Sequence, residues 1–457
     1  MRTSDKVQSS EEGKAILKRT YNDYGLNQEK LAKKASVSVD TVKRLLGTKD
    51  CPNGIERWAV TNIAKVLNLK PTDIVDPKDW YPQQQLPLEF EGLIYEKTQL
   101  FCGRKFVFDA IEEFIKNNRN GYFTIIGDAG MGKSTIAAKY ILDNREAICF
   151  FNIRAEGMNR PELFLKQIRE QLISRYDLQN VEDVGLSTLL RKVKQKLSAG
   201  ERLVIVVDAL DEVDQQKPSE NILNLPTVIP DDVYFLLTRR PYNDNDKRLN
   251  FSPATPIQEL DLRQEKKESN RDVKEYIWKF LNDGEYKHDL SQWIEKQKQI
   301  SNDEFVESMA IKSENNFMYL RCVLPAIANG FYNDKPLDEL PIGLQGYYQS
   351  HWQLMGMTTK PLPRDKIEIV YVMCVLRRAT SRKVIAKYSK QDEMTVQEVL
   401  DGWAQFLQKQ ENHQAARYRF YHESFREFLY RNDIVQAAGV NLREINSGLF
   451  KMITRRK

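Results

Sequence analysis

The chain has 457 residues, of which 41% are hydrophobic and 29% are charged. This length predicts about three domains, and an aromatic content of 10% excludes a disordered or fibrous chain. No apolar run approaches the roughly 18 to 20 residues that cross a bilayer, and the acidic start of the chain has no apolar signal-peptide core. We therefore expect a soluble, cytoplasmic protein that makes no membrane contact.

The cysteines and histidines are scattered along the chain. The five cysteines include no CxxC pair, and the four histidines show no metal-ligand spacing. Neither a disulfide framework nor a structural zinc site is therefore expected. We predict isolated, reduced thiols at Cys51, Cys102, Cys149, Cys322 and Cys374.

The net charge of +5 comes from the N-terminal segment alone. Residues 1–75 hold 14 Lys and Arg against 9 Asp and Glu, whereas the remaining residues hold 55 of each sign. A local basic excess is a weak indication of an anionic partner, and it directs the search for one to this segment.

Short helices are predicted across residues 11–70, within an N-terminal domain that covers residues 1–75. The second helix begins after Asn27, the third covers residues 38–46 and stops at Gly47, and the fourth covers residues 55–67. The apolar positions at helical spacing in the first and fourth helices are Ala15, Ile16 and Tyr21, and Trp58, Ile63, Ala64 and Leu67.

Residues 76–98 are predicted to be a linker, because they carry three prolines and a glutamine run and fit no period. From about residue 99, short apolar strands alternate with amphipathic helices, as is typical of a parallel sheet covered on both faces. The expected strands are 122–126, 147–152, 203–207, 233–237 and 256–260. Residues 270–435 are predicted to be mostly helical, with a hairpin at 406–421 that the polar run 410–414 interrupts.

The strongest motif is GDAGMGKS at residues 127–134, a full match to GxxxxGK[ST] between a predicted strand and a predicted helix. Its glycines let the backbone N–H groups face phosphates, Lys133 reaches the terminal phosphates, and the Ser134 hydroxyl is a Mg²⁺ ligand. The predicted nucleotide-binding residues are Gly127, Asp128, Ala129, Gly130, Met131, Gly132, Lys133, Ser134 and Thr135.

A second motif, LVIVVDALDE, covers residues 203–212. Asp208 ends a buried strand and is a candidate Mg²⁺ ligand beside the phosphate loop. Asp211 and Glu212 are candidates to orient or deprotonate the attacking water, or else they simply complement a helix dipole. Ala209 stands where many fast ATPases place a catalytic glutamate, so slow hydrolysis is expected.

A third strand runs into Thr238-Arg-Arg240-Pro241. An arginine at this strand end would stabilise the terminal phosphate. The alternative is that Arg239 and Arg240 are ordinary surface charges.

Together these motifs resemble the NACHT branch of the STAND NTPases, the signal-transduction ATPases that include animal innate immune receptors and many bacterial regulators. The resemblance covers about residues 99–435. Besides the phosphate loop, it rests on FCGRKFVFDAI (101–111), VVDALDE (206–212), LLTRRP (236–241), NNFMYLRCVL (315–324), LPIGLQGYYQSHW (340–352) and RFYHESFREFL (419–429).

The resemblance implies a nucleotide domain (99–255), a helical lid domain (256–355) and a winged-helix domain (356–435) that clamps ADP at rest, followed by a short tail (436–457). It implies ATP or ADP and Mg²⁺ as cofactors. It also implies that His422 touches the phosphates, that Gly103 and Arg104 hold the adenine edge, and that Arg240 is the phosphate-sensing arginine. Residues 315–317 lack the glycine and proline that the family often carries near the adenine.

Residues 26–47, LNQEKLAKKASVSVDTVKRLLG, resemble a helix-turn-helix of the phage-repressor type, with a recognition helix over about 38–46. Such a helix lies in the major groove of DNA. The side chains expected to contact DNA are Gln28, Ser38, Asp40, Thr41, Lys43 and Arg44. Binding of a protein adaptor and a purely structural role are the alternatives.

The sequence thus predicts a multidomain chain in which an α/β P-loop NTPase domain is flanked by an all-α helix-turn-helix domain, a helical lid and a winged helix. The favoured function is an ATP/ADP-gated switch that forms homo-oligomers on activation and binds DNA. The alternative is a bacterial NACHT immune receptor that acts against phage. A housekeeping ATPase is disfavoured by Ala209 and by the match at His422.

Overall fold

The computed structural model describes residues 6–51, 54–80, 86–181, 183–198, 200–215, 221–242, 249–282, 285–297, 300–410, 416–443 and 445. Two compact units divide the chain: residues 1–96 with 138–149, and residues 97–137 with 150–457. No helix within the described ranges is long and apolar enough to cross a membrane.

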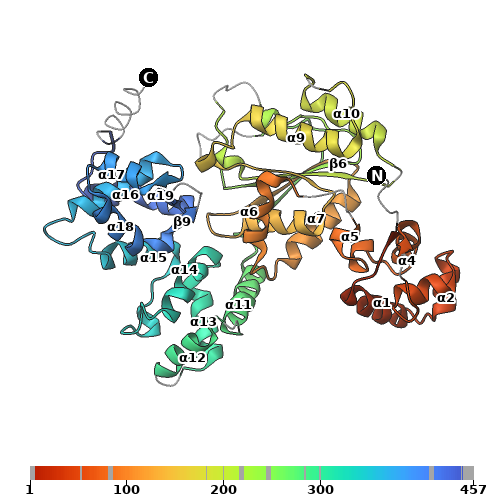
Figure 1. Cartoon of the computed structure of the whole chain (residues 1–457), viewed down its shortest axis with the longest axis horizontal. Helices are drawn as coiled ribbons and strands as arrows, with labels where there is room; N and C mark the ends of the chain where they lie inside the picture. Colours follow the sequence, from red (N-terminus) through yellow and green to blue (C-terminus); the bar gives the residue numbers. More distant parts are fainter. Residues whose placement is uncertain are drawn as a thin grey trace. The chain divides into compact units, whose positions relative to one another are not determined.

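The first unit begins with a small helical bundle, here called the N-terminal bundle (residues 6–80; red in Figure 1). Its helices are α1 (Glu11–Asp23), α2 (Gln28–Lys34), α3 (Val39–Leu45), α4 (Arg57–Val66) and α5 (Pro77–Trp80), with the 3₁₀ turn η1 (Pro71–Asp73). The side chains of Ser10, Asn27 and Ser38 accept backbone N–H groups and so start the first three helices. Buried apolar residues from every one of the first four helices form one core.

Three expectations for this bundle need correction. The strands β1 (Lys6–Val7) and β2 (Ile55–Glu56) pair antiparallel, so the bundle is not all-α. In α1 the core contacts come from Gly13, Leu17 and Tyr21 rather than Ala15, which is exposed, because the apolar face is rotated from the predicted one. Trp58 is 55% exposed and therefore does not belong to the buried face of α4.

The predicted linker 76–98 is also only partly a linker. The helix α6 (Leu88–Thr98) occupies its second half and buries Phe90 and Ile94. Tyr95 at the end of this helix lies under the Arg145 guanidinium, whose Cζ is 5.9 Å from the ring centroid. The first turn of α6 carries Glu89 and Glu91, which favour a helix start, but the prolines that precede the helix favoured a linker.

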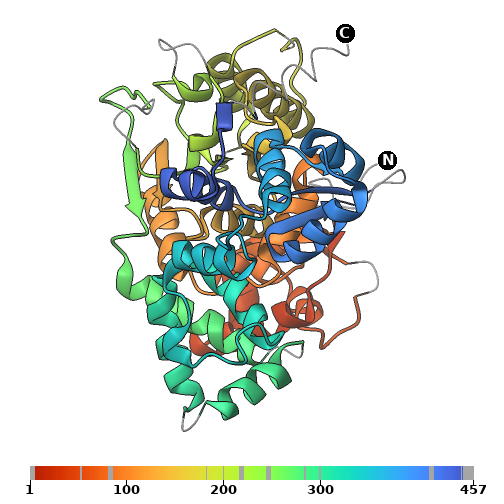
Figure 2. The same ribbon diagram turned by 90° about the vertical axis from the view of Figure 1, so that its left-hand side faces the viewer.

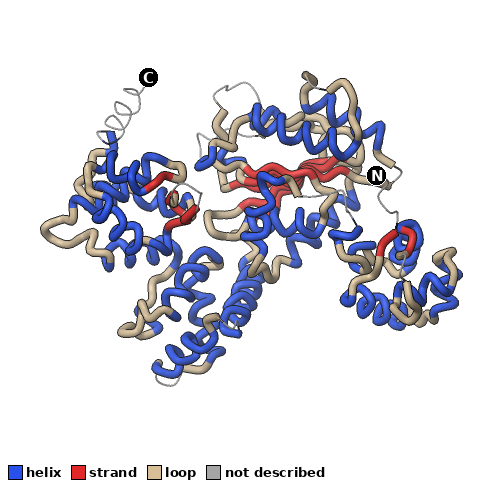
Figure 3. The backbone as a smooth tube through the Cα atoms, viewed as in Figure 1, coloured by secondary structure: helices blue, strands red, loops and turns tan. Residues whose placement is uncertain are grey.

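The second unit contains a parallel five-stranded sheet in the order β4-β5-β6-β3-β7. Its strands are β3 (Gly121–Ile126), β4 (Ile148–Phe151), β5 (Leu203–Asp208), β6 (Val233–Arg239) and β7 (Ile257–Asp261). Helices α9 (Pro161–Tyr176) and α10 (Leu186–Lys196) cover one face, and α7 (Lys105–Asn117) covers the other (Figures 1 and 3). The helix α8 (Lys133–Asp143) follows β3, and the short turns are η2 (Arg154–Glu156), η3 (Leu210–Glu212) and η4 (Ile222–Asn224). This is the predicted α/β core of a P-loop NTPase.

The middle helical segment (residues 266–354) follows the sheet, and the C-terminal segment (residues 364–437) follows it in turn (green to blue in Figure 2). The middle segment has α11 (Lys266–Asn282), α12 (Lys287–Lys296), α13 (Asn302–Ser313), α14 (Phe317–Ala328), η5 (Leu337–Glu339) and α15 (Gly343–Leu354). The C-terminal segment has α16 (Arg364–Leu376), β8 (Thr380–Ser381), α17 (Arg382–Ser389), α18 (Glu393–Gly402), η6 (Ala404–Phe406), β9 (Leu407–Gln410), β10 (Arg417–Phe420), α19 (Glu423–Leu429) and α20 (Asn432–Ala437).

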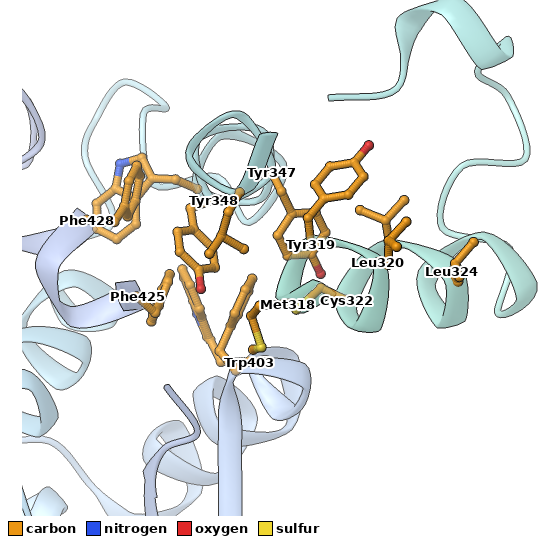
Figure 4. Packing of buried hydrophobic residues seen from close by; sticks show 14 of the residues in the cluster. Met318, Tyr319, Leu320, Cys322, Leu324, Tyr347, Tyr348, Trp403, Phe425 and Phe428 are labelled. Carbon is orange, nitrogen blue, oxygen red and sulfur yellow. The ribbon is translucent and has the colours of Figure 1, made fainter. Parts of the chain in front are cut away.

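Strands β8, β10 and β9 form an antiparallel sheet, so the predicted hairpin is present. Residues 411–414 of its interrupting polar run, like the tail from 446 onward, lie outside the described residues. One apolar core joins the middle and C-terminal segments, and the aromatic rings of Tyr347, Tyr348, Trp403 and Phe425 pack against one another within it (Figure 4). The two segments therefore bury their apolar residues against each other.

Candidate nucleotide site

The phosphate loop connects the end of β3 to the start of α8. Gly130 and Gly132 have φ angles of 83° and 88°, which only glycine adopts at little cost and which let successive N–H groups face one side. Lys133 Nζ donates hydrogen bonds to the carbonyl oxygens of Gly127 and Asp128, at 2.7 and 2.9 Å, and burial lowers the pKa of the lysine. An ammonium group therefore lies on a glycine-rich loop at the start of a helix, which is the chemistry that binds phosphate.

Asp208 ends β5 beside this loop. Its buried carboxylate accepts hydrogen bonds from the hydroxyls of Thr238 and Ser134, and burial raises its pKa while both hydrogen bonds oppose that shift. Thr238 Oγ1 also accepts the N–H of Ala209, which is held in the left-handed region at φ 55°. The threonine thereby fixes the strand end on which the carboxylate stands.

The neighbouring hydroxyl of Ser134 and carboxylate of Asp208 fit Mg²⁺, which takes oxygen ligands, keeps several waters and needs only one or two protein groups. When bound, the ion would neutralise charge on the phosphates. Among the residues that the structure describes, no cluster of three or more His, Cys, Asp or Glu could hold another metal.

The two acids after Asp208 engage different partners. Glu212 Oε2 accepts the N–H of Arg154 at 2.9 Å, and burial raises the pKa of this carboxyl to about 7. Asp211 is instead paired with Arg240, whose Nε lies 3.1 Å from its Oδ2. A carboxyl that titrates near neutral pH suits a general base, whereas a carboxylate paired with arginine suits a positioning role.

Arg239 ends β6 and Arg240 follows it, and the two side chains contact different partners. Arg239 donates to Glu259 Oε1 at 2.8 Å, and its Cζ lies 3.7 Å from the centroid of Tyr242, so it is directed across β3 to strand β7. Arg240 is the one that turns toward Asp211. Neither is an ordinary surface charge, because Arg239 is 5% exposed and Arg240 is held by two carboxylates.

The second carboxylate that holds Arg240 comes from the C-terminal segment. Glu427 of α19 accepts from the guanidinium at 2.5 Å. Because β6 lies between β3 and β5 in the sheet, the strand end that carries Arg240 lies between the phosphate loop and Asp208. The arginine therefore connects the nucleotide site to α19.

His422 is the first residue before α19 and is partly buried. Its Nδ1 accepts the backbone N–H of Ser424 at 3.2 Å and lies 2.6 Å from the Ser424 hydroxyl. Burial, and then the charges of Lys97, Arg240, Lys133 and Arg321, lower the pKa of the ring to about 3. The neutral ring thus carries its proton on Nε2, which is a donor suited to a phosphate oxygen.

Gly103 and Arg104 lie between α11 and the phosphate loop. The Arg104 guanidinium is buried and donates to Met131 O at 2.7 Å and to Ser269 Oγ at 3.1 Å. Its backbone N–H donates to Asp272 Oδ2 at 2.8 Å, and a Cβ at Gly103 would lie 2.4 Å from that carboxyl group. The arginine side chain therefore joins α11 to the phosphate loop, and any adenine contact here falls to the backbone.

Sequence reasoning missed two further contacts with the nucleotide domain. Asn316 Nδ2 donates to Ala129 O at 2.8 Å, and Met318 N donates to Gly130 O at 3.2 Å, so the start of α14 lies on the phosphate loop. The side chain of Asn316 also caps α14. An asparagine before an apolar helix predicts such a cap, but it does not predict the contact with the phosphate loop.

A second ion pair with the C-terminal segment was also missed. Arg419 of β10 lies 2.6 Å from Glu156 Oε1. Partners 263 residues apart leave no local pattern in a single sequence, and the same is true of Glu427 and Arg240, which are 187 residues apart.

The six predicted DNA-contacting residues lie on α2, on α3 and, for Ser38, at the cap that precedes α3 in the N-terminal bundle. Lys43 and Arg44 are exposed, whereas Ser38 and Thr41 bond each other at the start of α3. Asp40 forms an ion pair with Lys49, which lowers its pKa. The exposed positive charge on α3 therefore comes from its C-terminal half, while Gln28 begins α2 and is half-buried.

Residues 116–239 match the family model of an AAA domain. The matched segment includes the phosphate loop, Asp208 and the strand end at Arg239. Together with the parallel five-stranded sheet, this match shows an AAA-type P-loop NTPase domain. Domains of this type bind nucleotides.

Two solved structures resemble the chain at low similarity. The Drosophila ORC bound to DNA has 12% identity and a TM-score of 0.34, and the alignment covers 76% of this chain and 98% of that one. The Thermotoga maritima RuvB Holliday junction branch migration motor has 11% identity and a TM-score of 0.24, with coverage of 76% and 99%. Likeness of this extent carries no conclusion about function. No curated protein matches the chain.

Proposed function

We propose that this protein is an ATP/ADP-gated switch of the NACHT type of STAND NTPase, in which the middle helical segment is the lid, the C-terminal segment is a winged helix and the N-terminal bundle is a DNA-binding helix-turn-helix. One observation carries the proposal: Arg240 is shared between Asp211 of the nucleotide domain and Glu427 of α19. The domain boundaries that we propose are those read from the sequence.

The shared arginine gives the switch its physical basis. A γ-phosphate at the end of β6 would compete with Glu427 for the same guanidinium, because both are anions that pair with arginine. ADP lacks this phosphate and leaves the Arg240–Glu427 pair intact. ATP would therefore weaken the attachment of α19, and the Arg419–Glu156 pair would be lost with it as the winged helix moves away.

His422 would stabilise the resting state by a second contact. In the ADP-bound form its Nε2–H would donate to a β-phosphate oxygen, while Ser424 fixes the ring through Nδ1. Both anchors belong to the same short stretch, His422–Glu427. Release of that stretch would free the winged helix as one body with the lid, since they share a core.

Hydrolysis would return the switch to rest. Glu212, whose pKa is raised to about 7 by burial, would deprotonate the attacking water, and Asp211 would hold Arg240 in position. Because the position directly after Asp208 is Ala209 rather than a carboxylate, we propose a slow ATPase. Slow hydrolysis suits a switch better than a motor protein.

Opened protomers would associate and present several N-terminal bundles at once. The exposed Lys43 and Arg44 on α3 support DNA as the partner, since phosphate contacts supply most of the affinity of such modules. Joining weak modules raises the overall affinity by about 10² to 10⁴. The oligomer would thus bind DNA where one chain does not.

The test is Glu427→Gln, which removes the carboxylate but keeps the size of the side chain. We expect the variant to oligomerise at lower ATP concentration than the wild type, as measured by light scattering after size exclusion. Glu393→Gln is the matched control, because Glu393 pairs with Arg382 inside the C-terminal segment. If Glu427→Gln and the control both behave as the wild type, the gating proposal is wrong.

A further inference from the structure

Three successive carbonyl oxygens of the phosphate loop accept hydrogen bonds from groups outside the loop. The pairs are Asn316 Nδ2 to Ala129 O at 2.8 Å, Met318 N to Gly130 O at 3.2 Å and Arg104 Nη2 to Met131 O at 2.7 Å. Two of the three donors stand at the start of α14, in the middle helical segment. The backbone of the loop is therefore held from outside by other elements of the fold.

These bonds fix the direction of the N–H groups that follow the three carbonyls. In a planar trans peptide the carbonyl oxygen and the next N–H point in opposite directions. Because Ala129 O is held on the outside of the loop, the N–H of Gly130 points the other way, and Met131 O does the same for the N–H of Gly132. Both glycines lie at positive φ, the conformation in which successive N–H groups form a concave anion site.

Gly130 permits the close approach of α14 to the loop. The phosphate-loop motif requires glycine at positions 127 and 132 but leaves position 130 open. A Cβ at Gly130 would lie 2.3 Å from Asn316 Oδ1 and 2.8 Å from the Cβ of Met318. Any side chain at this position would therefore push the start of α14 away from the loop, which is a second reason for the glycine besides its φ of 83°.

The side-chain amide of Asn316 has two separate roles. Its Oδ1 accepts the N–H of Tyr319 at 3.1 Å and caps α14, and its Nδ2 donates to Ala129 O. Only this orientation of the amide serves both partners, because the carbonyl oxygen needs a donor and the N–H needs an acceptor. An aspartate at this position would keep the cap and lose the bond to the loop, so one substitution separates the two roles.

We propose that Asn316 is a positioning residue of the phosphate site, which holds the loop in its phosphate-binding shape while α14 is docked on it. The inference rests on the proposed nucleotide site and deepens it, because it makes the affinity for phosphate depend on the position of the middle helical segment. Coupling between two equilibria is reciprocal, so phosphates in the loop strengthen its contact with α14 by the same factor. The middle segment thereby responds to an occupied loop through the backbone of the loop itself.

The experiment measures ADP affinity by calorimetry for the full-length wild type and Asn316→Asp, together with hydrogen exchange of residues 127–134 in the absence of nucleotide. The variant loses the donor to Ala129 O and places a negative charge against that oxygen. ADP binding therefore weakens by about tenfold or more, and the loop amides exchange faster. The melting temperature is unchanged, because aspartate caps a helix as well as asparagine does. Asn27→Asp, the same substitution at the cap of α2, is the matched control and changes neither quantity.

A second variant, Asn316→Ser, keeps a neutral cap but is too short to reach Ala129 O, and it weakens ADP binding by about threefold to tenfold. Wild-type ADP affinity in both variants would overturn the inference. So would weaker ADP binding with unchanged exchange of the loop, or with a lower melting temperature in both variants, because the residue would then act on adenine or on the helix alone.

Lys133→Ala separates these failures from failure of the proposed site. If Lys133→Ala loses ADP while both Asn316 variants bind it as the wild type does, only the role of Asn316 is wrong. If Lys133→Ala keeps its ADP, the nucleotide site itself is wrong.

Discussion

Two pairs of short, packed helices in this chain differ in the charge of their second helix. In the N-terminal bundle, α2 packs on α3, whose exposed residues include Lys43 and Arg44. In the C-terminal segment, α17 packs on α18, whose exposed residues include Glu393, Glu398 and Asp401. DNA attracts the first helix and repels the second. Under the proposed function, a similar arrangement of helices serves two different tasks, and surface charge separates them.

The C-terminal segment makes its functional contacts elsewhere. Its residues that reach the nucleotide domain are on β10 and α19, where Arg419 pairs with Glu156 and Glu427 pairs with Arg240. We therefore assign the C-terminal helices to nucleotide gating and the N-terminal helices to output. The predictions below test each side of this division.

The largest effect is expected at the phosphate loop. Lys133→Ala removes the ammonium group from the phosphate site, and nucleotide bound to the purified protein should fall to background. Nucleotide released by denaturation and quantified by chromatography measures this directly. Lys105→Ala, which removes a surface lysine of α7, should keep full occupancy. Full occupancy in Lys133→Ala would contradict the site.

The next effect is on hydrolysis. Glu212→Gln should retain ATP and slow its hydrolysis by about 10² to 10⁴, the usual contribution of a general base. Because burial raises the pKa of this carboxyl to about 7, the wild-type rate should fall as the pH drops below that value and the base becomes protonated. Single-turnover rates on both sides of pH 7 test this. A variant with the wild-type rate and pH profile would show that another group activates the water.

A smaller effect is expected where the C-terminal segment meets the phosphates. His422→Ala removes one hydrogen bond to phosphate, about 1.5–3 kcal/mol, and only in the closed state, so ADP release should accelerate by about 10 to 150-fold. Stopped-flow release of a fluorescent ADP gives the rate. The control is His288→Ala, which changes an exposed histidine of α12. Unchanged release from a variant that melts like the wild type would make the histidine purely structural.

The smallest effect is expected on the N-terminal helices. Lys43→Ala and Arg44→Ala should each weaken DNA binding for all sequences. Each should also reduce the slope of log affinity against log salt concentration by about one, because one phosphate contact is lost. Lys18→Ala with Arg19→Ala removes two exposed charges of α1 and controls for net charge. If the wild type shows no salt-dependent affinity for DNA, the basic helix serves a protein partner instead.

Local sequence patterns predicted the nucleotide domain well. The strands that carry the phosphate loop, Asp208 and Arg240 are continuous apolar runs with motif residues at their ends, so each could be recognised alone. Arg239 and Arg240 could not be ranked by their spacing, because the direction of each side chain depends on Glu259 and Asp211, which come from other elements.

Features that depend on distant partners were not predictable in this way. The helix α6 was hidden because its two buried residues, Phe90 and Ile94, follow a proline-rich stretch. The contacts of Arg104 with Met131 and Asp272, which lie 27 and 168 residues further along the chain, likewise leave no local pattern. Charge pairs between elements likewise follow from the fold and not from spacing.

The most direct test of the whole account is the affinity of the full chain for one DNA fragment in its two nucleotide states. Glu212→Gln loaded with ATP should bind about 100-fold more tightly than the same protein loaded with ADP, since the oligomer presents several bundles together. Parallel light scattering reports the size of each species. Equal DNA affinity in the ATP and ADP states, with oligomers present only in the first, would contradict the division between gating and output.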